Sequence, residues 1–270
     1  MPGVPANAGD DVLPRLGLIC LLFVGVAVAL RGTAPSRHGP SLQVASHRRL
    51  PADFEAGTLL LPWQGLQTVS PRIGTDIVAA VDGQIRVLVL LTSESTRQEA
   101  ERQLAEADLS GEAVSLLVAA HETPWIRDYG PIPLLSSGRG LPSDNAALRK
   151  PSLMLVDTPY YFAHRRQDDQ LPRQLATALE LPLEELPYFV CGGNLLSNGQ
   201  GLVLSTYSLV GENVGRGIDE SQLRTLLAER LGVEKLLLLE PLKGEITGHV
   251  DMFATFTAAD TVGVGAYDPD

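Results

Sequence analysis

One short stretch of the chain combines an acid, an indole and an Arg-Asp pair, Glu122-Thr-Pro-Trp-Ile-Arg-Asp-Tyr-Gly-Pro131. Trp125 could face a cation, Arg127 could pair with a carboxylate, and Asp128 could bind a cationic ligand. The two prolines remove backbone donors and disfavour the α conformation in the residues before them, so the sequence predicts a shaped loop and not a helix. Because apolar runs flank it, we expect this loop to join two strands and to carry functional side chains.

A second stretch mixes glycines with polar residues, Cys191-Gly-Gly-Asn-Leu-Leu-Ser-Asn-Gly-Gln-Gly201, between the strand-like Tyr188-Phe-Val190 and residues 202–206. Its glycines allow a backbone to approach a ligand closely. Asn198-Gly199 alone is also a standard two-residue signal of a hairpin turn. From these residues both interpretations stay open.

The third stretch is Gly248-His-Val-Asp-Met-Phe253. On an extended segment, a spacing of two residues puts His249 and Asp251 on one side, so an imidazole and a carboxylate would converge. Taken alone, such a pair is as often a structural contact as a catalytic one. With His121 or Glu122 the pair could also bind a metal, but the spacing fits no compact metal motif, and we expect no metal and no cofactor.

The elements that must position these residues are short. From Leu50 onward, apolar runs of strand length alternate with helical patterns, which predicts an α/β fold. Strands outnumber helices, and this favours small mixed units that recur over one doubly wound sheet. The predicted strands are residues 58–62, 85–91, 114–119, 153–156, 202–204, 236–239 and 261–264. The predicted helices are residues 73–81, 94–107, 171–179 and 221–231, the last capped by Asp219 and Gln222 and ended by Gly232.

The beginning of the chain is expected to lie outside this fold. An apolar run at residues 16–30 follows Arg15 and ends near Ala27-Val-Ala29, which is the layout of a signal peptide. The run is short for a membrane helix, so a cleaved signal is favoured over an uncleaved anchor that contacts the membrane, or a misassigned start. We therefore predict an exported protein, secreted or in the cell envelope. Its expected parts are a signal peptide or membrane anchor at 1–31, a disordered tether at 32–49 and a globular domain at 50–270.

Composition limits the partners. The chain has 270 residues, 44% of them hydrophobic and 20% charged, as in ordinary globular proteins. Its net charge of -11 argues against nucleic acid, which requires a basic face, and suits a cationic ligand weakly. The two cysteines, Cys20 and Cys191, cannot form a disulfide framework. We interpret Cys191 as a buried structural thiol.

Together, Trp125-Ile-Arg-Asp-Tyr-Gly-Pro131, Gly192-Gly-Asn194 and Gly248-His-Val-Asp-Met252 resemble the motifs of the agmatine deiminase and bacterial peptidylarginine deiminase family. The resemblance starts near Leu50, runs to the last residue and keeps the order of the motifs. It implies the five-bladed α/β-propeller, or pentein, fold, made of repeated ββαβ-like blades, of which about three would be present here.

The resemblance also implies a chemistry. A guanidinium is a planar cation that carboxylates bind through two parallel hydrogen bonds. Asp128 and Asp251 would hold it, and His249 would give a proton to the leaving ammonia after a cysteine thiolate attacks the carbon. The candidate substrate-binding residues are Trp125, Arg127 and Asn194.

Each of these three residues has more than one interpretation. Trp125 could wall the site by a cation–π contact or be a buried anchor of its loop, and the sequence favours neither. Arg127 is expected to pair with a neighbouring carboxylate and shape the loop more than to touch a cationic substrate. Asn194 is expected to hold backbone or water near the site.

In the family, the nucleophilic cysteine lies in a second Gly-rich segment beyond the His-x-Asp motif, and Cys191 does not match that position. The expected function is a deiminase that converts agmatine to N-carbamoylputrescine in putrescine biosynthesis, or peptidyl-arginine to citrulline. Its partner would be a small cationic guanidine or an arginine-containing peptide. The alternative is a non-catalytic guanidinium-binding remnant without the nucleophile. A partial propeller would expose strand edges, so we expect such a chain to aggregate or to need a partner.

Overall fold

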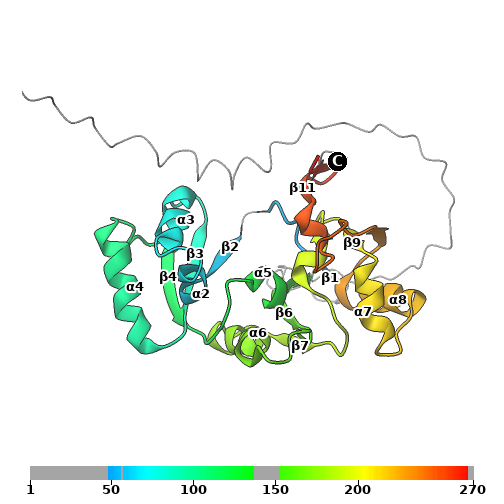
Figure 1. The fold of residues 1–270 in the computed structure, drawn as a ribbon, viewed down its shortest axis with the longest axis horizontal. Helices are drawn as coiled ribbons and strands as arrows, with labels where there is room; N and C mark the ends of the chain where they lie inside the picture. The colour runs from blue at the N-terminus through cyan, green and yellow to red at the C-terminus, as the bar shows by residue number, and fades with distance from the viewer. Residues whose placement is uncertain (1–47, 56, 137–151, 267–270) are drawn as a thin grey trace, which may run out of the picture.

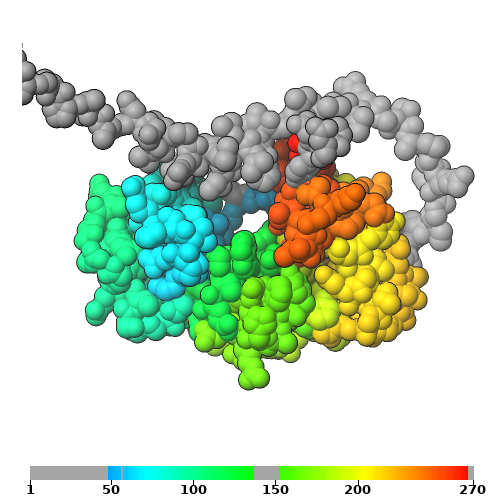
Figure 2. All heavy atoms as spheres, in the orientation of Figure 1, coloured from blue at the N-terminus to red at the C-terminus, as the bar shows by residue number. Residues whose placement is uncertain are grey.

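The computed structural model describes residues 48–55, 57–136 and 152–266. Its elements form small α/β units that follow one another along an arc (Figure 1), and the same units are successive lobes in Figure 2. The predicted signal peptide or anchor at residues 1–31 lies outside the described residues, as does most of the predicted tether. No helix within the described ranges is long and apolar enough to cross a membrane.

The first unit is a parallel sheet whose middle strand is buried along almost its whole length, because helices connect its strands. The strands are β2 (Thr58–Pro62), β3 (Arg86–Leu91) and β4 (Val114–Val118). The helices are α2 (Trp63–Gln67), α3 (Ile73–Val81) and α4 (Glu94–Glu106).

The next two units share one plan, in which an antiparallel hairpin is followed by a helical crossover to a parallel strand. The second unit contains β5 (Ile132–Ser136), β6 (Ser152–Asp157), α6 (Arg166–Ala178) and β7 (Leu183–Glu185), with β1 (Arg48–Arg49) beside β5. The third contains β8 (Leu196–Ser197), β9 (Leu202–Thr206), α7 (Ser208–Val214), α8 (Glu220–Leu231) and β10 (Lys235–Leu239). A further hairpin consists of β11 (Ala254–Ala258) and β12 (Thr261–Val264).

The predicted α/β fold of recurring mixed units is therefore confirmed, and so are the predicted strands and helices. Helix α8 begins at the predicted capping box, where Asp219 accepts from the backbone N–H of Gln222, and ends at Gly232 with a φ of 69°. Its leucines at positions 223, 227 and 231 are fully buried. The predicted turn at Asn198-Gly199 belongs to the connection between β8 and β9, which extends to Gly201.

Several local predictions are wrong. Residues 126–129 form a one-turn helix, α5 (Ile126–Tyr129), because both prolines lie outside it and Gly130 N–H donates to the Ile126 carbonyl at 2.8 Å. Asp251 lies in a 3₁₀ turn, η4 (Val250–Met252), and not on an extended segment, and only His249 before it is extended. The segment Tyr188-Phe-Val190 is irregular, and helices α2 and α7 were not predicted.

Apolar clusters join neighbouring units. Leu90 of β3 and Leu171 of α6 belong to one cluster, so the first and second units share a core. Ile132 of β5 and Leu223 of α8 belong to another, which joins the second and third units. This shared packing fixes the loops at the unit boundaries relative to one another.

Candidate functional site

Asp128, His249 and Asp251 converge on the backbone of Gly193. A Cβ atom at Gly193 would lie 2.5 Å from Asp128 Oδ1, 2.6 Å from His249 Nδ1 and 3.0 Å from Asp251 Oδ2. Such distances exclude any side chain there, so a glycine is required for the three functional groups to approach each other. The structure thus brings together the three residues predicted to be catalytic, while their catalytic role stays a prediction.

Asp128 stands in α5, and a buried acid from the next helix fixes the loop that leads to it. Asp168 of α6 accepts hydrogen bonds from the backbone N–H of Glu122 at 2.7 Å and of Thr123 at 3.2 Å. Tyr129 OH donates to the Thr123 carbonyl at 2.6 Å. Since Asp168 is fully buried, this connection holds the loop firmly against the second unit.

Gly193 belongs to a 3₁₀ turn, η3 (Gly192–Asn194), whose last residue connects two other parts of the site. The Asn194 side-chain oxygen accepts from the backbone N–H of Thr206 at 3.0 Å and of Val250 at 3.2 Å. Its side-chain nitrogen donates to Thr206 Oγ1 at 3.1 Å. Asn194 therefore holds backbone, as one prediction stated. Because its buried amide already has protein partners, its predicted contact with substrate is not supported by this geometry.

A carboxylate also fixes the turn that carries His249. Glu245 accepts from the backbone N–H of Thr247 at 2.9 Å and of His249 at 3.3 Å, and also from Gly248 N–H. Burial opposes ionisation, but these hydrogen bonds hold the pKa of Glu245 below its usual value. Gly248 has a φ of 69° and packs against Ser208 at the start of α7.

The site favours positive charge. His249 Nδ1 lies 3.4 Å from Asp128 Oδ1. Burial lowers the pKa of His249, but the hydrogen bond and charge of Asp128, with the charges of Asp251 and Glu212, raise it above its usual value. Burial raises the pKa of Asp251 to about 6, and the charge of Asp128 adds to this shift while His249 and Arg127 oppose it. A cation placed between the two carboxylates would favour the ionised form of both.

Trp125 and Arg127 lie on the outer side of this loop. Trp125 is 56% exposed, so the interpretation as a buried anchor is wrong, and its ring is open to a ligand. Arg127 donates to Asp53 Oδ1 at 2.8 Å and to the Leu195 carbonyl at 3.3 Å. It pairs with a carboxylate as predicted, and it connects the loop to the segments around Asp53 and Leu195. Contact of either residue with substrate stays a prediction.

Cys191 is a buried thiol. Its Sγ donates to the Asp128 carbonyl at 3.5 Å, and burial together with the Asp128 charge raises its pKa. Among the described residues, Asp128, Cys191 and His249 form the group that could hold a metal, with ligand atoms within 4.8 Å of one another. A metal would have to displace the thiol proton. His121, once considered as a ligand, instead bonds the Ala119 carbonyl through Nδ1 at 2.9 Å.

Three acids that were not predicted from the sequence each hold a segment of the site: Asp53, Asp168 and Glu245. Asp168 acts on backbone that is 46 residues away in the chain, and no local pattern predicts such a contact. Glu245 could have been predicted from the sequence, since an acid a few residues before a glycine in a loop is a common turn-stabilising arrangement.

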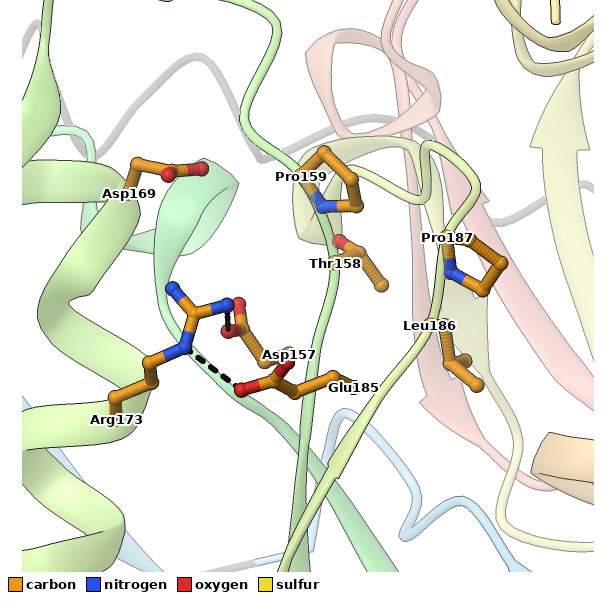
Figure 3. A pocket seen from close by; sticks show the side chains of 8 residues that line it. All are labelled: Asp157, Thr158, Pro159, Asp169, Arg173, Glu185, Leu186 and Pro187. Carbon is orange, nitrogen blue, oxygen red and sulfur yellow. Dashed lines mark hydrogen bonds and ion pairs between the residues drawn. The ribbon is translucent and has the colours of Figure 1, made fainter.

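A pocket of about 510 Å³ lies between α6, β6 and β7, and its lining includes none of the predicted site residues (Figure 3). In it, the Arg173 guanidinium lies 3.3 Å from Asp157 Oδ2 and 2.8 Å from Glu185 Oε1. Arg173 pairs with both acids, so the pocket presents an ion-pair network in which the acids, with Asp169, outnumber the one cation. Burial raises the pKa of Asp157 to about 6, although Arg173 opposes the shift.

This pKa makes stability depend on pH. The pKa of Asp157 is about 6 in the folded state and 3.8 in the unfolded state, so the folded state binds the proton more tightly. The contribution of Asp157 to stability is therefore fully present below pH 3.8 and is lost as the pH rises through 6. The difference in free energy of unfolding between Asp157→Asn and the wild type should therefore shift in favour of the variant by roughly 2 kcal/mol from about pH 4 to pH 7. Urea unfolding across this range measures the difference. Glu185→Gln, which removes the other partner of Arg173, should not show this gain, and parallel curves for Asp157→Asn would contradict the prediction.

Asn194→Ala should destabilise the fold by about 2–4 kcal/mol, because it leaves buried N–H groups of Thr206 and Val250 without an acceptor. Chemical denaturation measures this loss. Gln200→Ala removes an exposed amide from the nearby hairpin and should change stability by less than about 0.5 kcal/mol. Equal stability of the two variants would show that Asn194 does not hold the site together.

Comparison with known proteins agrees with this geometry. Residues 62–270 match the model of the Porphyromonas-type peptidyl-arginine deiminase family. A predicted agmatine deiminase of Yersinia pseudotuberculosis is 25% identical over 155 residues, which are 53% of this chain and 39% of that protein.

Solved structures are similar as well. The agmatine deiminase of C. jejuni has a TM-score of 0.60 at 20% identity, over 80% of this chain and 61% of that one. The agmatine deiminase of Enterococcus faecalis has a TM-score of 0.62 at 23% identity, over 78% and 59%. At these identities the likeness shows the fold, and the chain spans less than two thirds of each of these relatives. Since the match to residues 62–270 covers well over half of the chain, the chain belongs to the Porphyromonas-type peptidyl-arginine deiminase family.

Proposed function

We propose that this chain binds a guanidinium group between Asp128 and Asp251, as part of a deiminase that converts the group to a ureido group and releases ammonia. The convergence of these carboxylates with His249 on Gly193 is the observation that carries the proposal. A guanidinium presents several N–H donors in one plane, and two acids on different loops can accept from different edges of it. Family membership supports the reaction class.

The residues have distinct roles in this proposal. A thiolate forms a bond to the guanidinium carbon, the C–N bond breaks, and nitrogen leaves as ammonia with a proton from His249. Water then adds to the same carbon, returns a proton to His249 and displaces the thiolate, which leaves the ureido product. Asp128 and Asp251 hold the planar cation and stabilise its charge throughout. No described residue matches the nucleophile, since Cys191 is buried and its pKa is raised.

Free agmatine and an arginine in a peptide share the group that the carboxylates would bind. A cysteine-to-serine variant of the C. jejuni agmatine deiminase has been solved with its substrate bound, and a P. gingivalis relative is named as an arginine deiminase. The exposed Trp125 would suit a cation–π contact with either ligand. Export, proposed from residues 1–31, would favour a peptidyl substrate over agmatine and putrescine biosynthesis.

The second candidate function is a guanidinium-binding protein without turnover. The observation that favours it is that the described residues supply the acids and the histidine but no cysteine that matches the nucleophile. A measurement of binding together with ammonia release separates the two functions.

The full chain should bind agmatine and an arginine-containing peptide more tightly than putrescine, which lacks the guanidinium. Asp128→Asn and Asp251→Asn should each weaken this binding by roughly 10- to 100-fold, because a carboxylate partner of the cation is lost. Asp82→Asn removes the same charge from an exposed turn after α3 and should leave binding unchanged. Titration calorimetry reads the affinity, and an ammonia assay reads turnover.

The outcomes differ in meaning. Binding with ammonia release supports the deiminase, whereas binding without release supports the guanidinium-binding protein. If neither guanidine binds, or if Asp128→Asn and Asp82→Asn bind equally well, both functions fall.

Affinity for a guanidine should also depend on pH. Since the pKa of Asp251 is raised to about 6 in the empty site, protonation competes with the cationic ligand. The association constant should therefore be highest above neutrality and fall by up to about tenfold per pH unit below 6. Calorimetry between pH 5 and 8 measures this dependence, and affinity that is flat or rises toward pH 5 would contradict it. In Asp251→Asn the remaining binding should lose most of this slope.

A further inference from the structure

Three buried polar atoms around His249 have no hydrogen-bond partner in the described part of the chain: Nε2 of His249 itself, Oε2 of Glu212 and the hydroxyl of Tyr161. Nδ1 of His249 faces Asp128, so Nε2 is the nitrogen left over. The Tyr161 and His249 rings meet edge to face, with centroids 6.3 Å apart. Buried polar groups are rarely left unpaired, and such a gathering indicates a small polar molecule shared among them.

The position of α7 explains why Glu212 belongs to this group. Ser208, at the start of α7, packs against Gly248, the residue before His249. Glu212 follows Ser208 by four residues and therefore lies on the same face of the helix. At the other end, fully buried Asn213 accepts from Phe189 N–H at 3.0 Å and donates to its carbonyl at 2.9 Å, which ties α7 to the segment before Cys191. The helix that carries Glu212 thus contacts both the turn before His249 and the segment before Cys191.

Charge couples these groups. Burial raises the pKa of Glu212, and the nearby His249 charge opposes that shift. Glu212 in turn contributes to the raised pKa of His249. Yet no ion pair joins the two residues within the described structure, where the ion pair of the His249 imidazole is the one to Asp128. Electrostatic coupling without contact, combined with unpaired atoms on both sides, fits a bridging water.

We propose that Glu212 is a second acidic partner of His249, and that it acts through an internal water site formed by Glu212, Tyr161 and Nε2 of His249. Glu212 is a positioning residue. It stabilises the protonated imidazole from the side opposite Asp128, and the water satisfies all three unpaired atoms. The electrostatic coupling between Glu212 and His249 does not depend on any reaction. Its catalytic role rests on the proposed function, in which protonated His249 supplies the proton that the leaving ammonia takes.

The test is the titration of His249 in the full chain, followed by NMR of labelled histidines and assigned by the signal that His249→Asn removes. Glu212→Gln should lower the pH at the titration midpoint of His249, because an acid that favours the protonated imidazole is lost. Glu212→Asp, which keeps the charge but draws it back by one methylene, should give an intermediate midpoint. Glu101→Gln, which removes the same charge from an exposed position on α4, should give the wild-type midpoint.

General loss of stability would not produce this graded order. Glu212→Gln is similar in size and removes the charge of a half-buried carboxylate whose buried Oε2 has no direct partner in the described structure, so its melting temperature should match or exceed that of the wild type. A His249 midpoint in Glu212→Gln equal to that in Glu101→Gln would overturn the proposal. Tyr161→Phe, which removes one holder of the water, should shift the midpoint in the same direction by less, and no shift would overturn the shared water site.

The outcomes also separate this inference from the proposed function. If agmatine and the arginine peptide fail to bind the wild-type chain, the proposed function falls, while the titration still decides the role of Glu212. If they bind and the titration is insensitive to Glu212, only the present inference falls.

Discussion

The close approach of two carboxylates and an imidazole over one glycine is the constraint on which the rest of the site depends. Burial disfavours the charged form of Asp251, and repulsion from the like charge of Asp128 adds to this effect, which together raise the pKa of Asp251 to about 6. The arrangement persists because rigid hydrogen bonds fix the backbone on every side. Asp168 fixes the loop to Asp128, Asn194 fixes Val250, and Glu245 fixes His249. The site is thus held in a high-energy arrangement by groups that a ligand would not touch.

These hydrogen bonds are effective only because the units of the fold cannot move apart. Asp168 binds backbone 46 residues away and Asn194 binds Val250 56 residues away, whereas Glu245 acts within its own turn. Apolar clusters between neighbouring units keep the distant segments in register. Within one unit, a hairpin and a crossover helix could not place three loops around one point. The geometry of the site therefore depends on the boundaries between units. Loss of packing at a boundary would disturb the site without a change to any residue in it.

The sequence predicts which residues form the site better than it predicts their geometry. Asp128, His249 and Asp251 come from compact local motifs, and the strands come from apolar runs that need no partner to be recognised. The one-turn helix α5 and the 3₁₀ turn of Asp251 were missed because each is a single turn closed by a local backbone hydrogen bond, too short to leave a periodic pattern in the sequence. Asp168 and Glu212 were missed for a related reason. An isolated acid in a helix looks like solvated surface until the fold shows what it faces.

Three carboxylates, Asp128, Asp251 and Glu212, affect the charge of the one imidazole of His249. Burial and the charge of Asp128 raise the pKa of Asp251 to about 6, so below that pH protons take part of the place that a cation would occupy. A guanidinium that enters would replace them, because its charge is permanent. Under the proposed function, ligand binding below about pH 6 is then an exchange of the Asp251 proton for an organic cation, beside the one imidazole whose pKa all three acids raise.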